Sequence, residues 1–163
     1  MTTTERTERI MAQADAYHLE AARIRREALS QALIGLEDAL STPIGDGERW
    51  RLRVAMAVDY AANRIEEHIE QTEAPDGVLV EVAEAAPRLT KRVGDLRADH
   101  EHLEKEIHGL QVALSDLDDT DVASRGVAIR NEALEFLGRL ATHRQRGADL
   151  MYEAYQVDIG ASH

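Results

Sequence analysis

Apolar residues recur at alternating steps of four and three along most of the chain, and this spacing is typical of helices that pack into a bundle. One such series runs from residue 89 to residue 117. It consists of Leu89, Val93, Leu96, His100, Leu103, Ile107, Leu110, Leu114 and Leu117. His100 is the only member that is not apolar. The series predicts a helix that is buried along one face and carries one polar side chain into the core.

Two further segments show the same spacing, and each contains one histidine. The first gives the series Val54, Val58, Ala61, Ile65, His68 and Thr72. The second gives Val122, Gly126, Ile129, Ala133, Phe136, Leu140, His143, Gly147, Leu150, Ala154 and Val157. We therefore predict helices over residues 49–72 and 122–156, each with a histidine on its core-facing side.

The N-terminal segment is the least regular of the predicted helices, which we place over residues 5–40. Its second half has the core-facing series Leu29, Leu33, Leu36 and Leu40. Continued towards the N-terminus, the same spacing passes Arg26, Ala22, Leu19, Asp15 and Ala12. We expect the apolar series to turn outward near Asp15, and we expect Arg26 to extend to solvent or to pair with a glutamate. His18 lies beside this series.

Three polar turns separate the predicted helices: STPIGDGE (41–48), TEAPDG (72–77) and DDTD (118–121). The last of them offers an N-cap to the helix that follows. A short helix is predicted over residues 78–86, and Pro87 either opens the next helix or kinks it. Short connections place consecutive helices side by side and antiparallel. We therefore predict a single all-α domain over residues 1–163, an up-down-up-down four-helix bundle with a short extra helix and a core over about residues 8–157.

Composition agrees with this fold and excludes several kinds of site. Of the 163 residues 44% are hydrophobic but only 4% aromatic, a balance that suits long packed helices. The formal charge of −12 argues against nucleic acid or an anionic membrane as a partner. The chain has no cysteine, which excludes disulfides, zinc–thiolate sites and thiolate nucleophiles. With neither a secretion signal nor a membrane-spanning apolar run, we expect a cytoplasmic protein.

The histidines His18, His68, His100 and His143 come from four different predicted helices. In antiparallel neighbours, residues equally far from the shared loop lie at the same height. His18 and His68 are then nearly level, and His100 and His143 differ by about one turn, roughly 6 Å. A single core histidine is more often a hydrogen-bonded core residue than a ligand. Several at one height would leave many buried nitrogens to satisfy, and a divalent metal ion would satisfy them together.

The segments HIEQTE, DHEHL and HRQRGADL resemble hemerythrin-like proteins, the HHE cation-binding four-helix bundles. The resemblance covers most of the chain, from the first helix to DLMYEAY (149–155). It implies a non-haem iron site, usually with two irons, held by inward histidines of all four helices and by carboxylates. It also implies reversible oxygen binding, or a role in oxygen, nitric oxide, peroxide or iron handling.

When the family's ligand positions are transferred to this sequence one at a time, the resemblance implies one histidine ligand on each helix. His68 is the implied ligand of the second helix, His100 of the third and His143 of the fourth, while His18 serves for the first. Three imidazoles with one carboxylate suit iron, zinc or manganese, and the resemblance favours iron, with one ion or two.

The implied carboxylates are less regular than the histidines. Thr72 stands where the family usually has a bridging glutamate, and Glu73 follows one residue later, about 100° further around the helix. Glu104 lies one turn after His100, where a second histidine is common, and Gly147 lies one turn after His143. Glu73 and Glu104 therefore complete the set of candidate metal ligands.

Two classes of function remain open at this point. The first is a metal-binding bundle whose partner is a small diatomic molecule or peroxide, with or without enzymatic turnover. The second is a metal-free bundle of the same ancestry that acts as a binding or assembly module, which the missing bridging carboxylate favours. The sequence leaves open whether the chain forms a homodimer.

Overall fold

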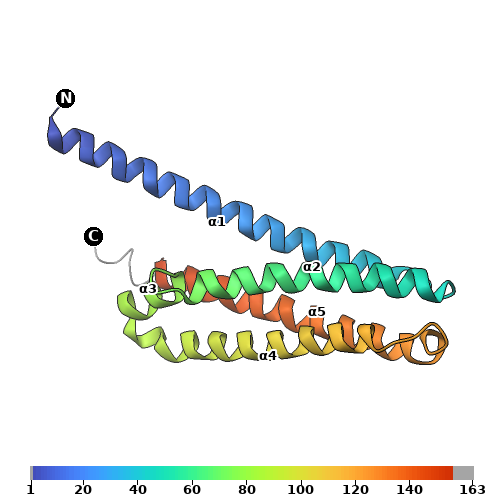
Figure 1. Ribbon diagram of the computed structural model, residues 1–163. Coiled ribbons are helices and arrows are strands. Elements are labelled where there is room, and N and C mark those ends of the chain that lie inside the picture. The colour runs from blue at the N-terminus through green and yellow to red at the C-terminus, as the bar shows by residue number, and fades with distance from the viewer. Residues whose placement is uncertain (1, 156–163) are drawn as a thin grey trace.

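The computed structural model describes residues 2–155, apart from the side chains of His18 and Leu19. Every regular element in this range is a helix, which confirms the predicted all-α class (Figure 1). The long helices are α1 (Thr3–Ser41), α2 (Gly47–Glu73), α4 (Thr90–Ser115) and α5 (Val122–Glu153). Between α2 and α4 lie α3 (Val78–Ala85) and the short 3-10 helix η1 (Pro87–Leu89). No helix within residues 2–155 is both long and apolar enough to cross a bilayer.

The ends of α4 and α5 follow from local sequence. Pro87 is the first residue of η1, where its missing N–H costs no hydrogen bond, so the chain enters α4 through a tight turn rather than a kink. Asp121 is the N-cap residue of α5, but its side chain makes no capping hydrogen bond. The Asp118 carboxylate instead accepts from the backbone N–H groups of Thr120 and Asp121. The aspartates of DDTD thus stabilise the turn before α5 rather than its first helical turn.

On α4 the buried side chains are those that the spacing predicts. All nine residues of the series from Leu89 to Leu117 are buried. α1 packs against α2, α2 against α4, and α4 against α5. The core falls into two clusters of buried apolar residues, a larger one that contains Trp50 and Phe136, and a smaller one around α3 that contains Val82 and Leu150. The histidines of α2, α4 and α5 lie between these clusters.

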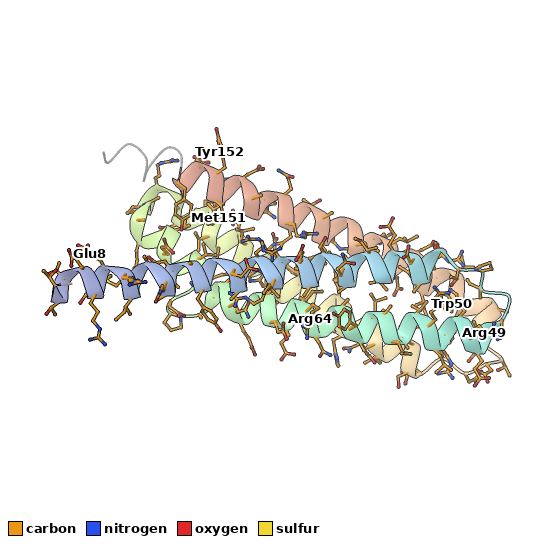
Figure 2. All side chains as sticks on the ribbon, turned by 90° about the horizontal axis from the view of Figure 1, so that it is seen from above. Glu8, Arg49, Trp50, Arg64, Met151 and Tyr152 are labelled. Carbon is orange, nitrogen blue, oxygen red and sulfur yellow. The ribbon has the colours of Figure 1, made fainter. Side chains whose placement is uncertain are left out.

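The first half of α1 stands apart from the other helices (Figure 1). Leu29, Leu36 and Leu40 are buried in the bundle, whereas every described side chain from residue 2 to residue 17 is exposed. Seen from above, side chains project from both edges of this segment, with Glu8 near its free end (Figure 2). α1 thus joins the core only from Leu29 onward, later than the spacing predicts. We call residues 3–28 the arm of α1.

The divergence of the arm has a cause in its sequence. Arg26 and Asp15 occupy two of the positions that would face the bundle, and both side chains are exposed. Burying either charge against an apolar core without a partner would cost far more free energy than the neighbouring alanines could recover. Arg26 therefore extends to solvent, the first of the two alternatives that its position predicts.

Candidate metal centre

His68 of α2, His100 of α4 and His143 of α5 meet in one cross-section of the bundle, which we call the histidine layer. One ring nitrogen from each lies within 4.8 Å of the other two. The centroids of the rings are 4.7 to 5.9 Å apart. His100 and His143 are buried, and His68 is half-buried. The three histidines that interrupt the apolar series thus form a group able to hold a metal ion.

Carboxylates fix the orientation of two of these rings. Nδ1 of His100 lies 2.8 Å from Oε1 of Glu73, and Nδ1 of His143 lies 3.1 Å from Oδ2 of Asp99. The same Asp99 oxygen accepts a hydrogen bond from Arg146 at 2.7 Å. A carboxylate accepts only from a protonated nitrogen, so each Nδ1 carries the proton of its ring. This carboxylate–histidine pairing is the arrangement that normally supports a metal-bound histidine.

The inward nitrogens of the same two rings face each other. Nε2 of His100 lies 3.1 Å from Nε2 of His143. With both Nδ1 atoms protonated, two neutral rings would present only lone pairs on Nε2, and facing lone pairs repel unless a shared proton or a metal ion lies between them. Two nitrogens bound to one ion at about 2.0–2.1 Å are themselves about 3 Å apart. The donor set therefore fits a metal ion.

The surroundings lower the pKa of two of the three histidines, His68 and His143, and so favour the neutral form that binds metal. Burial, together with the rings of His100 and His143 and the charge of Arg144, lowers the pKa of His68 to about 4. Burial also lowers the pKa of His143, although the hydrogen bond and charge of Asp99 oppose this shift. Near pH 7 a metal ion would displace few protons from these two rings.

The other predicted ligands lie elsewhere. The side chain of His18 is outside the part of the chain that the structure describes. Glu104 is exposed on α4 and does not belong to the group of histidines. Glu73 reaches the layer from the last residue of α2, where it holds Nδ1 of His100 rather than the space between the inward nitrogens. The bridging position is thus not filled by a carboxylate of any described residue.

Thr72 and Gly147 stand at two positions where the resemblance would place polar ligands, and the structure shows the surroundings of each. The Thr72 hydroxyl donates to the backbone carbonyls of His68 and Ile69, so it is engaged within its own helix. Among the described residues, a Cβ atom added to Gly147 would meet no atom within 4 Å. These residues therefore leave space open one turn from His143.

Asp99 is the functional residue that the apolar spacing missed. It precedes His100 on α4 and so falls outside the core-facing series. A signal does exist: Asp99 and Glu106 on α4 and Arg139 and Arg146 on α5 form complementary series with equal steps of seven residues. In the structure these pair as Asp99 with Arg146 and Glu106 with Arg139.

A pocket of about 380 Å³ lies between these two ion pairs on the α4–α5 side of the bundle. Its lining includes His143, Asp99 and Leu103, together with His102, whose side chain is exposed. Since His143 borders both the pocket and the histidine layer, the pocket brings solvent next to a ligand of the candidate metal centre.

No protein-family model matches the chain, and neither a curated protein nor a solved structure matches it. The resemblance to hemerythrin-like proteins therefore stays a prediction from the residues. The case for a metal centre comes from the geometry of the histidine layer itself.

The lowered histidine pKa values predict that the metal-free protein loses stability in mild acid. An unfolded histidine titrates near pH 6.5, whereas folded His68 titrates near 4. Between these values the unfolded chain binds more protons, so stability is complete above about pH 6.5 and falls as the pH drops towards 4. Urea unfolding at pH 7.0 and pH 4.5 should give a loss of about 2–3 kcal/mol from this residue.

The variant His68→Leu should lose less stability than the parent over the same interval, because its layer has one fewer histidine to protonate. His108 is exposed on α4, so His108→Leu is the control and should behave like the parent. Equal losses in the parent and in His68→Leu would show that His68 does not remain neutral in the folded protein.

Proposed function

We propose that this protein binds a divalent transition-metal ion between His68, His100 and His143. The observation that carries the proposal is the facing pair of Nε2 atoms, 3.1 Å apart, while each Nδ1 is held by a carboxylate.

The residues around the layer have distinct roles in this proposal. The three imidazoles bind the ion as neutral ligands, which leaves coordination positions open for a small molecule. Glu73 and Asp99 orient two of the rings and offset two positive charges, which favours a divalent ion. Arg146 holds Asp99 in place. A bound transition metal would supply a Lewis-acidic centre and, if it is iron, a redox-active one.

The positions of the carboxylates favour one metal ion over two. Two irons need bridging oxygen ligands, yet Glu73 is engaged with His100 and Glu104 is exposed. We therefore propose one ion in preference to two. Three imidazoles also accept zinc or manganese, so we propose iron only on the basis of the hemerythrin-like resemblance.

We further propose that the chain is a hemerythrin-like, up-down-up-down bundle that acts on oxygen, nitric oxide or peroxide, or handles iron. Space for such a small molecule is available beside Gly147, and the pocket next to His143 offers a route from solvent. The half-buried position of His68 leaves that side of the layer more accessible than the other two rings.

The test is the metal content of protein purified without an affinity tag from iron-supplemented and from zinc-supplemented cultures. We expect about one ion per chain in at least one preparation, and an optical spectrum of the fresh protein would identify ferric iron. Less than a few tenths of an ion per chain in every preparation would contradict the proposal and favour a metal-free binding module.

The carboxylate partners give a separate prediction. Asp99→Ala removes the acceptor for Nδ1 of His143, so that ring loses its fixed tautomer and some basicity. Loss of such a partner typically weakens metal binding by 10–100-fold. Titration of the metal-free variant with Zn²⁺ should show a decrease of that size.

The control for this variant is Asp95→Ala, one turn earlier on α4, where the carboxylate pairs with the exposed Lys91. It should leave zinc affinity within about threefold of the parent. If both alanine variants bind zinc as tightly as the parent, Asp99 does not support a metal ligand.

A further inference from the structure

The arm of α1 has a second apolar stripe that does not face its own bundle. The stripe follows steps of four and three and consists of Ile10, Ala14, Tyr17, Ala21 and Ile24. Its three large side chains are 57%, 72% and 53% exposed, in chain order. At 100° per residue the stripe is centred roughly 90° around the helix from the buried residues Leu29 and Leu36, beside the edge of the buried face that holds Ala32 and Ala39. Ala21 of the stripe is half-buried. The arm therefore presents its apolar stripe sideways.

The bundle to which the arm belongs is poorly placed to cover this stripe. α1 is one continuous helix, and it contains no proline and only one glycine, Gly35. Leu29, Leu36 and Leu40 are packed in the core, which sets the direction of the helix axis. Sharp kinks in helices need a proline, a glycine or a similar defect, and residues 3–28 contain neither proline nor glycine.

We propose that the arms of two copies of this chain pack against each other as an antiparallel helix pair through this stripe. Large residues and alanines alternate along it. In the antiparallel register that aligns the two stripes, Ile10 faces Ala21 of the second copy, and Tyr17 faces Ala14 of the second copy. Each contact occurs twice because of the two-fold symmetry. Pairing a large side chain with an alanine in every central layer lets the helices approach closely.

Charge supports a second copy as the partner. The same register places Arg6 next to Glu27 of the second copy, again twice, at positions that flank the stripe. The Glu27 carboxylate also accepts a hydrogen bond from Arg23 of its own helix. The arm's basic residues are balanced one for one by acidic residues: Arg6, Arg9, Arg23, Arg25 and Arg26 against Glu5, Glu8, Asp15, Glu20 and Glu27.

This balance matters because the whole chain carries a formal charge of −12. All of that net charge therefore lies outside the arm. Two copies that met through their bundles would repel each other, whereas two neutral arms can approach without this penalty. The arm is thus the part of the molecule best suited to self-association.

Sedimentation velocity over a concentration series tests the interface. We expect the parent protein to be dimeric at tens of micromolar. Ala14→Glu should raise the dissociation constant at least 100-fold, because it places two carboxylates in the central layers. Ala16→Glu is the matched control: Ala16 is also exposed but lies on the opposite side of the arm, so its dissociation constant should change by less than about threefold.

Two results would overturn the proposal. One is a parent protein that stays monomeric up to about 100 µM. The other is equal dimerisation of the Ala14→Glu and Ala16→Glu variants, which would place the interface elsewhere. Circular dichroism of both variants, expected to match the parent, separates loss of dimer from loss of helix.

Cysteine cross-linking tests the antiparallel register, since the chain has no cysteine of its own. A mixture of the Ile10→Cys and Ala21→Cys variants should form a disulfide-linked heterodimer under mild oxidation, because facing positions come close enough for a disulfide. Ile10→Cys alone should cross-link at least tenfold more slowly. Faster cross-linking of Ile10→Cys with itself would show a parallel pair and contradict the proposed register.

Discussion

Addition of Zn²⁺ to the metal-free protein is expected to raise its melting temperature by about 8–16 °C. A ligand that binds only the folded state, at a free concentration 1,000 times its dissociation constant, stabilises that state by about 4 kcal/mol. For a chain of this size each kcal/mol shifts the midpoint by about 2–4 °C. The expected increase is large because the ligands are already gathered in the folded protein. Scanning calorimetry with and without chelator measures it.

This experiment separates the two classes of function that the sequence leaves open. A metal-free assembly module should melt at the same temperature with zinc and with chelator. Magnesium at the same concentration is the control ion, since it prefers oxygen ligands and should not shift the midpoint. An identical shift with both ions would indicate binding to the acidic surface rather than to the histidine layer.

Replacement of His100 by leucine is expected to lower zinc affinity by more than about 100-fold. Loss of a carboxylate that supports a metal ligand lowers metal affinity by 10–100-fold on its own. This variant removes a metal ligand together with its hydrogen bond to Glu73. Leucine fills the buried position with a side chain of similar size, so a packing defect should contribute little. Competition with a chromogenic zinc chelator measures the dissociation constants.

His108→Leu is the matched control, because His108 is exposed and lies on the same helix as His100. It should bind zinc as the parent does. If His100→Leu retains parental affinity, the ion binds elsewhere and the histidine layer is a structural feature of the core. The unfolding midpoint of each metal-free variant should be measured alongside, so that weakened folding is recognised.

The sequence predicts the buried face of the bundle well because a helix repeats every 3.6 residues. Every member of the series from Leu89 to Leu117 is buried, including His100. The same reasoning brings His68 and His143 to that height, since short turns leave little freedom in how neighbouring helices align. Three members of the candidate site could thus be named before the structure was seen.

The roles of the carboxylates depend on contacts between helices. Glu73 is a predicted metal ligand, but at the end of α2 it lies beside Nδ1 of His100 instead. Asp99 faces α5 rather than the core, and its importance becomes clear only from its distance to His143. Periodicity describes which side of one helix is buried, but it does not describe which polar group on a neighbouring helix lies within hydrogen-bonding distance.

The path of α1 shows a different limit of the spacing rule. Leu29 and Leu36 follow the core-facing series, and the bundle would be closed if the series continued. Arg26 and Asp15 interrupt it, while the competing stripe that includes Tyr17 points elsewhere. A helix with two apolar stripes at different angles can bury only one of them in the bundle, and the large side chains of the other are exposed.

X-ray absorption at the zinc edge of the zinc-loaded protein shows directly whether three imidazole nitrogens bind one metal ion. We expect a first shell that contains about three nitrogen ligands at roughly 2.0–2.1 Å, with the outer-shell scattering that rigid imidazole rings produce. A first shell of oxygen ligands without imidazole scattering would contradict metal binding by the histidine layer.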